Sequence, residues 1–488
     1  MKRNSIFCSF CILVALCWGM TSCDGFLKEK SRDALPEEEG YSNISELYLN
    51  AVASLYNYIG GNADSQGLQG TGRGIYDLNT FTTDEAIMPT RGGDWYDGGF
   101  WQGLFLHKWG VNNDAIQATW EYLYKVIMLS NNSLEHIETY ALTHSDAELS
   151  GYRAEVRAFR AMYYYYLMDL FGRIPLVLHS NVASKDIVLS ERKNVFDFVV
   201  RELQEAAPLL PAQFSNRSGN YYGRLTRPVA YFLLAKLALN AEIYTDNNWT
   251  DGVRPDGKNI FFEIDGTTLN AWQAAETYCD KITAFGYRLE PDYTANFAVY
   301  NESSVENIFT VPMSKTLYTN KMQYLFRSRH YNHAKALGLS GENGSSATIE
   351  ALQTFGYDTD LQDPRFDFCY YAGIVYDLKG NVVKLDDGTV LVYEPWKVKL
   401  DISDEPYEKT RVRAPERVAT LENLLAERQL EFAWEGWRRQ DLIRFGQFTR
   451  AYSSRPQLPD EENGYTTVFP IPEKIRQMNP GWEQHPGY

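Results

Sequence analysis

The sequence predicts an all-α dominated protein with tetratricopeptide-like helix pairs, a few short β-hairpins and a long loop-rich face. Apolar residues recur at helical spacing through residues 41–286 and again within 411–488, which predicts a helical frame. Residues 287–410 are dense in Gly, Asn, Asp and Ser and lack such stripes. We therefore expect one domain over residues 41–488, with binding carried by the loops of the middle region.

Start and stop signals place the helices along the first half of the chain. Asn43-x-x-Glu46 is similar to a capping box, and Gly60-Gly61 ends the helix that follows it. Small residues at the expected crossings resemble tetratricopeptide packing, although their spacing is not a clean repeat. Further helices are expected to begin at Asp114, Ser145, Asn194, Thr226 and Ala271.

The middle region contains short strand-like runs at Ile308–Val311, Gly373–Asp377 and Val390–Tyr393. Asp386-Asp387-Gly388 is a hairpin signal between the last two runs. Helical spacing returns over residues 415–434. The predicted second half is therefore mostly loop, displayed on helices.

The N-terminus has the three parts of a signal peptide. A basic start precedes the apolar run Ile6–Met20, and small residues then lead directly to Cys23. That order is typical of a bacterial lipoprotein, in which the thiol is acylated after cleavage. We interpret residues 1–22 as the signal peptide and 23–40 as lipid anchor and tether. Plain secretion with a chance cysteine is the alternative.

Composition narrows the class of partner. The formal net charge is −16, and loss of the basic leader makes the mature chain more negative. An acidic surface repels phosphate backbones, so we expect no nucleic-acid partner. No second apolar run reaches membrane length. Outside the leader and Cys23, only Cys279 and Cys369 remain; we expect both to be buried and free.

The segment Thr83–Trp101 carries the first candidate binding site. It holds four aromatic residues within seven positions, flanked by glycines and acids. Flat rings can cover the apolar faces of sugars while polar groups bond to the hydroxyls. An alternative for Trp101 is that it turns inward and joins the core. The candidate ligand contacts are Asp84, Arg91, Asp94, Trp95, Tyr96 and Trp101.

The segment Tyr324–His333 carries a second candidate, with Tyr331 and Asn332 as ligand contacts. His330 and His333 could bind a metal, but two histidines without nearby thiols more commonly satisfy bonds within a loop. We therefore predict no metal site in this segment.

One acidic run could bind a metal ion. Asp358, Asp360 and Asp363 could hold calcium, although the Gly and the terminal Glu of an EF-hand loop are missing. We expect no cofactor, with calcium as the alternative.

Three stretches carry a resemblance to a known family. They are Gly151–Val177, Gly223–Arg227 with the Ala/Leu-rich helix after it, and the C-terminal signature. The signature reads E-R-x-x-E-x-x-x-E-G-x-R-x-x-D-L-x-R-x-G over Glu427–Gly446, then P-I-P, N-P-G and a final P-G-Y. His485 stands where the family often has Asn. The chain resembles the SusD/RagB family of Bacteroidetes outer-membrane lipoproteins.

This resemblance implies a helical frame of tetratricopeptide-like pairs and a glycan site near the loop after the first helix. It implies nutrient capture for polysaccharide utilization at the outer face of the cell outer membrane, with Cys23 in the lipid. It also implies a partner, a SusC-like TonB-dependent transporter that the protein covers as a lid. For the signature itself we expect an ion network that joins the last helices to the body. Its members are Glu427, Arg428, Glu435, Arg438, Asp441 and Arg444.

Four functions remain distinguishable at this level. Capture of an oligosaccharide is favoured by the aromatic segment and the acidic charge. Capture of a peptide, as in RagB-type lipoproteins, and a purely structural transporter accessory are alternatives. A surface glycoside hydrolase is disfavoured because Asp84 and Glu85 are adjacent, and adjacent acids rarely face each other at the separation that hydrolysis needs. We therefore expect a binding protein without catalytic residues.

Overall fold

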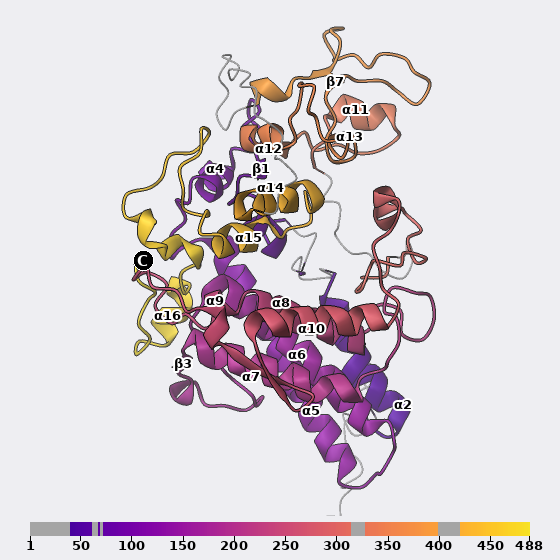
Figure 1. Cartoon of the computed structure of the whole chain (residues 1–488), viewed down its shortest axis with the longest axis vertical. Helices are drawn as coiled ribbons and strands as arrows, with labels where there is room; N and C mark the ends of the chain where they lie inside the picture. The colour runs from indigo at the N-terminus through magenta and orange to yellow at the C-terminus, as the bar shows by residue number, and fades with distance from the viewer. Residues whose placement is uncertain (1–39, 61–66, 69–71, 314–326, 399–419) are drawn as a thin grey trace, which may run out of the picture.

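The computed structural model describes residues 40–60, 67–68, 72–313, 327–398 and 420–488 (Figure 1). The signal peptide, Cys23 and nearly all of the tether lie outside these ranges. So do the start of the second candidate segment and the first residues of the helix expected from Pro415. Among the helices in the described ranges, none is both long and apolar enough to cross a bilayer.

The fold is mainly helical, and its frame is a stack of helices that pack in chain order (Figure 1). The predicted first helix is present but changes type along its length, from α2 (Ile44–Leu47) through a π turn to a 3₁₀ turn ending at Tyr58. The remaining frame helices are α5 (Asp114–Ala141), α6 (Leu149–Phe171), α7 (Arg192–Ala206), α8 (Arg227–Leu239), α9 (Ala241–Tyr244) and α10 (Ala271–Ala284).

Local chemistry explains the ends of these helices. Asn113 caps α5 by accepting the N–H groups of Ala115 and Ile116 at 3.0 and 3.1 Å. Asn270 and Gln273 form a capping box on α10. Gly172 ends α6 at φ 65°, a left-handed conformation that favours glycine. The predicted helices therefore begin and end close to their sequence signals.

A second, loop-rich layer sits on this frame, and α14 and α15 lie between the two (Figure 1). Within it, β1 and β6 pair antiparallel, with Ala86 opposite Ala347. Two small apolar clusters belong to this layer, apart from the main core of the frame. Its elements are α3 (Ile75–Thr80), β1 (Ala86–Ile87), α4 (Phe100–Phe105), α11 (Tyr331–Ala336), β6 (Ser346–Ala347), α12 (Ile349–Thr354), α13 (Phe366–Cys369), β7 (Gly373–Ile374) and β8 (Val392–Tyr393). The two helices between the layers are α14 (Leu421–Glu431) and α15 (Arg438–Arg444), and α16 (Glu473–Met478) lies beside the frame (Figure 1).

The strand predictions were only partly correct. The predicted turn at Asp386–Gly388 is present, since Lys384 and Val390 form a β-bridge across it. The expectation of a strand at Ile308–Val311 was wrong, because this run is not assigned to a strand and has no ladder partner among the residues that the structure describes. Two further antiparallel pairs were not anticipated: β2 (Ile174–Pro175) with β3 (Leu189–Ser190), and β4 (Phe261–Ile264) with β5 (Thr267–Asn270).

Buried ion pairs of the C-terminal signature join the two layers, and the predicted network is confirmed in part, since Arg428, Arg438, Asp441 and Arg444 belong to it. Arg439, which was not predicted, also takes part. Arg439 reaches Asp169 on α6 at 3.0 Å, and Arg438 reaches Asp84 beside β1 at 2.6 Å. Arg428 and Arg444 both pair with Asp441, at 2.7 and 2.8 Å. Because these pairs are mostly out of water and hydrogen-bonded on both sides, breaking one would leave a buried charge.

The two described cysteines do not form a disulfide. Cys279 on α10 is exposed and Cys369 on α13 is half-buried. The expectation that both are free is confirmed, but the expectation that both are buried was wrong. The amphipathic helix α10 presents Cys279 on its outer face, where a small apolar residue is tolerated.

Candidate functional site: an aromatic cleft

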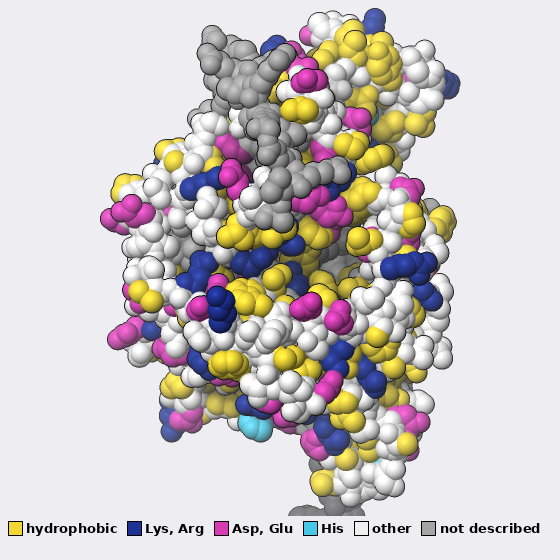
Figure 2. All heavy atoms as spheres, in the orientation of Figure 1, with side chains coloured by type: hydrophobic (Ala, Val, Ile, Leu, Met, Phe, Trp, Pro, Cys, Tyr) yellow, Lys and Arg dark blue, Asp and Glu magenta, His cyan; other side chains and the backbone are white. Residues whose placement is uncertain are grey.

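A cleft of about 1260 Å³ opens in the loop-rich layer where this layer meets the α14–α15 connection. Its walls come from five separate parts of the chain. They are residues 89–92, 293–297, 328–347, 367–371 and 392–398, with Trp434 and Glu435 at its base. In the space-filling view, hydrophobic side chains gather with Lys and Arg side chains in the middle of the face (Figure 2). The volume is large enough for several sugar units.

One wall of the cleft is aromatic. Phe368 is 62% exposed, and its ring lies 6.4 Å from that of Tyr293, which in turn lies 5.3 Å from Phe297. Tyr371 and Tyr393 meet edge-on at 5.7 Å. Rings left exposed inside a concave site, instead of packed in the core, offer flat apolar surfaces to a ligand.

Another wall is polar. The β1–β6 pairing brings Arg91 next to Ser346, whose hydroxyl oxygen accepts a 2.7 Å hydrogen bond from Arg91 Nη2. The chain before β6 doubles back, so that the N–H groups of Glu342 and Asn343 donate to the carbonyl of Arg329 at 3.2 and 2.8 Å. Hydroxyl, amide and guanidinium groups therefore line the cleft together with its rings.

The two segments predicted from the sequence meet at the rim of this cleft. Tyr331 donates a 2.9 Å hydrogen bond to Asp94, and Trp95 Nε1 donates to the carbonyl of Glu342 at 2.8 Å. Asn332 Nδ2 donates to the carbonyl of Lys384 at 2.8 Å, and Tyr96 is exposed. Of the predicted ligand contacts, only Arg91 lines the cleft itself.

Two of the predicted ligand contacts need correction. Asp84 is 1% exposed and its carboxylate is bound by Arg438, so it is a structural residue. Trp101 is 2% exposed, stacks edge-on against Phe81 at 5.4 Å and donates to Asp97 at 2.8 Å. Burial makes both unavailable to a ligand, and the alternative of a core Trp101 is the correct one.

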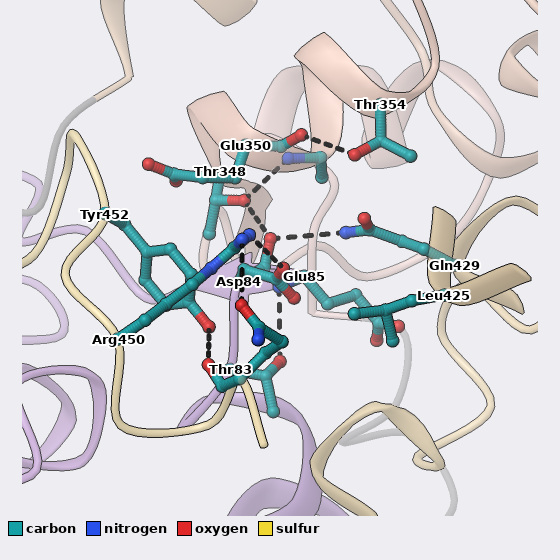
Figure 3. Close-up of polar contacts among 12 residues, drawn as sticks. Thr83, Asp84, Glu85, Thr348, Glu350, Thr354, Leu425, Gln429, Arg450 and Tyr452 are labelled. Carbon is teal, nitrogen blue, oxygen red and sulfur yellow. Dashed lines mark hydrogen bonds and ion pairs between the residues drawn. The ribbon is translucent and has the colours of Figure 1, made fainter. Parts of the chain in front are cut away.

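Asp84 and its neighbours form a cluster of hydrogen bonds and ion pairs, the Asp84 cluster, that attaches this layer to the rest of the protein (Figure 3). The carbonyl of Asp84 accepts hydrogen bonds from Thr348 before α12 and from Gln429 on α14, the latter at 3.3 Å. Glu85 is equally buried and accepts the N–H of Trp434 at 3.2 Å. Burial raises the pKa of Glu85 to about 8, so this carboxyl group is largely protonated at neutral pH.

Replacing Glu85 with glutamine is expected to stabilise the protein at alkaline pH. The folded-state pKa lies above the unfolded value, so the wild type loses stability as pH rises from about 4.5 towards 8, where Glu85 must ionise while buried. Glutamine keeps the acceptor for Trp434 without the charge. The free energy of unfolding at pH 9 should rise by about 2–4 kcal/mol, with little change at pH 5, as measured by urea unfolding.

Glu138→Gln is the matched control, since Glu138 is exposed on α5 and pairs with Arg153. It should change stability by less than about 1 kcal/mol at either pH. Equal effects of Glu85→Gln at pH 5 and pH 9 would show that Glu85 does not titrate as argued.

The histidines and acids considered as metal ligands have other partners. His333 is buried with Nδ1 3.2 Å from the Tyr393 hydroxyl, and His330 caps α11 by accepting the N–H of Asn332 at 3.1 Å. Asp363 binds Arg365 at 2.9 Å. Within the described ranges, no three His, Cys, Asp or Glu side chains are grouped as a metal site would need. The expectation that the protein binds no cofactor, with calcium as the alternative, stays a prediction.

Sequence reasoning missed most of the aromatic wall. The sequence contains one signal for this wall, in the run Phe366-Asp-Phe-Cys-Tyr-Tyr371, which has four aromatic residues within six positions. Alternate residues of that run divide between the small core and the cleft, since Phe366 is buried while Phe368 is exposed. Tyr293 and Phe297 have no comparable signal, because they reach the cleft from a distant loop.

The fold and this cleft define a class: proteins with a helical frame and a loop-rich layer that holds an open cleft. A family sequence model described as "Starch-binding associating with outer membrane" matches residues 37–239. The starch-binding protein SusD of Bacteroides thetaiotaomicron is 24% identical over 305 residues, which are 61% of this chain and 48% of SusD. A SusD-like protein of Bacteroides ovatus is 24% identical over 202 residues, 41% of this chain and 33% of that protein.

Solved structures share the whole architecture. A laminarin-binding SusD-like protein superposes with a TM-score of 0.59 at 20% identity, over 91% of this chain and all of that one. A SusD-like protein of Bacteroides fragilis gives 0.65 at 17% identity, over 93% and 99% of the two chains. The chain is therefore similar to SusD-like proteins in sequence over part of its length and in its fold. The matched sequence spans about half of SusD, or less for the other relative.

Proposed function

We propose that the protein captures nutrient oligosaccharides in the aromatic cleft and does not transform them. The observation that carries this proposal is the cleft itself, in which exposed rings such as Phe368 and Tyr371 face hydroxyl, amide and guanidinium groups. Sugars need this combination, since their ring faces are apolar and their edges carry hydroxyls. The relatives named for binding starch and laminarin support the same ligand class.

Delivery to a membrane transporter completes the proposed function. The family model is described as associating with the outer membrane, which supports a SusC-like TonB-dependent transporter as the partner. We further propose that Cys23 carries the lipid that holds the protein at the outer face of that membrane. Co-purification with a barrel protein from detergent-solubilised membranes supports the partnership; recovery as a lone monomer contradicts it.

Peptide capture is the second candidate function. The cleft carries carboxylates on Asp367 and Glu435 as well as the guanidinium of Arg329, so it offers partners to both ends of a peptide. The wide aromatic wall favours a sugar instead, because a peptide backbone needs rows of paired N–H and C=O groups. Hydrolysis is disfavoured, since Asp84 and Glu85 are buried and held by an ion pair and a hydrogen bond in the Asp84 cluster.

Removing an exposed ring from the cleft is expected to weaken oligosaccharide binding. Phe368→Ala deletes a large contact surface, and truncating such a contact costs more than about 1 kcal/mol. The dissociation constant should therefore rise by about 10-fold or more, as measured by calorimetry with the best ligand from a glycan array.

Phe261→Ala is the matched control, because Phe261 is 63% exposed but lies on β4 of the helical frame. It should leave affinity unchanged. Failure of the wild type to bind any neutral or acidic oligosaccharide, with retention of peptides, would favour the second candidate. Release of smaller sugars on incubation would contradict the non-catalytic role.

A further inference from the structure

The polar wall of the cleft contains a compact group of basic side chains. Arg91, Arg329 and His333 all line the cleft beside Tyr393. The hydroxyl of Tyr393 accepts the backbone N–H of His330 at 2.8 Å and lies 3.2 Å from His333 Nδ1. Two guanidinium groups and the imidazole of His333 thus lie with one phenol in the same wall of the cleft.

No carboxylate neutralises these arginines within the described part of the chain. The side chain of Arg91 has one bond there, to the neutral hydroxyl of Ser346, and Arg329 has no ion pair. Other arginines of this layer are paired: Arg327 binds Asp77 and Arg365 binds Asp363. Among the described residues of this layer, the arginines without a carboxylate partner are thus those of the cleft wall, Arg91 and Arg329, and there a ligand could supply the negative charge.

The acids nearest to this wall are already engaged elsewhere. Asp94 accepts a hydrogen bond from Tyr331 at 2.9 Å, and Glu394 pairs with Lys397 at 2.7 Å. Asp386 is 3.3 Å from the amide of Asn332. The cleft lining as a whole holds as many acids (Asp367, Glu394 and Glu435) as Lys and Arg residues, so the positive charge is local to the wall formed by Arg91 and Arg329. At that wall it attracts an anionic group, even in a protein whose net charge is −16.

The backbone holds the basic wall in place. The β1–β6 ladder and the Arg91–Asp94 bridge fix the chain on one side. Hydrogen bonds from Glu342 and Asn343 to the carbonyl of Arg329 fix it on the other. Burial lowers the pKa of His333, and the neighbouring charges of Arg329 and His330 lower it further. The pKa of His330 is also lowered by burial, so both shifts favour the neutral imidazoles and the two arginines carry the positive charge of this wall.

We propose that the cleft selects acidic saccharides, whose carboxylate or sulfate group is bound by Arg91 and Arg329 while the sugar ring packs on the aromatic wall. This inference rests on the proposed function and adds the ligand class to it. A guanidinium group binds carboxylates and sulfates through two parallel hydrogen bonds, which gives both charge and geometry. The exposed ring of Tyr371 lies on the same side as Tyr393, so one sugar unit can contact both features.

The test compares matched charged and neutral ligands. Binding of a galacturonate trimer, its carboxyl-reduced neutral counterpart and a sulfated galactan oligosaccharide is measured by calorimetry at low and high salt. The wild type should bind an acidic ligand about 10-fold or more tightly than the neutral one, as charge-assisted hydrogen bonds predict, and high salt should reduce that preference. Comparison of the first and third ligands shows whether carboxylate or sulfate is preferred.

Arg91→Gln and Arg329→Gln remove the charge but keep a hydrogen-bond donor. Each should weaken acidic binding and leave neutral binding within about twofold, and the double variant should abolish the preference. Arg153→Gln, on the surface of α6, is the matched control and should change neither. Melting temperatures confirm that each variant is folded. Phe368→Ala should weaken both ligand types alike.

Three outcomes would overturn the inference. Equal affinity of the wild type for charged and neutral ligands leaves saccharide capture intact but removes acid selection. Equal loss of both ligand types in the arginine variants means that these residues shape the wall instead of binding charge. Binding of acidic peptides with no saccharide binding overturns both this inference and the proposed function.

Discussion

Replacing Arg438 with methionine is expected to lower the free energy of unfolding by about 3–5 kcal/mol. Arg438 is buried and holds both carboxylate oxygens of Asp84, at 2.6 and 2.8 Å, and it also donates to the carbonyl of Leu425 at 2.9 Å. Methionine fills similar space but leaves the buried Asp84 carboxylate without its two short hydrogen bonds. Urea unfolding at pH 7, monitored by circular dichroism, measures the loss.

A nearby arginine supplies the control. Arg450 lies 3.9 Å from the same carboxylate but is 48% exposed, so Arg450→Met should cost less than about 1 kcal/mol. Adding Asp84→Asn to Arg438→Met should recover about 1 kcal/mol or more, since it removes the stranded charge. If Arg438→Met costs no more than Arg450→Met, the ion pair does not fasten the two layers.

Replacing Trp101 with alanine is expected to cost about 3–5 kcal/mol of stability, because it leaves a cavity in the core. The ring of Trp101 packs against Phe81 and Phe100, and the guanidinium carbon of Arg327 lies 5.1 Å from its centre. Urea unfolding at pH 7 measures the cost. The prediction separates a structural tryptophan from a ligand-binding one, because a ligand contact would lose affinity and little stability.

Tyr96→Ala serves as the comparison. Tyr96 belongs to the same segment but is exposed, so its removal should change stability by less than about 0.5 kcal/mol. A small stability loss for Trp101→Ala together with weakened oligosaccharide binding would reinstate the ligand role that burial argues against.

The helical frame was predictable because its signals are local. Asn113, Asn270 and Gly172 act within one turn of the helices that they begin or end, so a short stretch of sequence contains the whole cause. The two-residue strands were not predictable in the same way. Ile308–Val311 has the composition of a strand but no partner in the described part of the chain, and pairing depends on what the rest of the chain brings alongside.

The site was less predictable because burial is decided at long range. Asp84 and Arg91 lie seven positions apart and both looked available to a ligand. Arg438, which is 354 residues away in the chain, covers Asp84, while nothing covers Arg91 in the same way. Tyr293 and Phe297 join the cleft from a distant loop and carry no local pattern. Prediction from the sequence found the rim of the site, not its aromatic wall.

The Asp84 cluster also bears on how ligand preference can diverge among related proteins. The residues that fasten the loop-rich layer, such as Arg438, Thr348 and Gln429, are separate from those that face the cleft, such as Arg329 and Phe368. Substitutions on the cleft walls therefore need not weaken the attachment of the layer. A chain built in this way can acquire new specificity by exchanging wall residues, while selection for folding acts on a different set of positions.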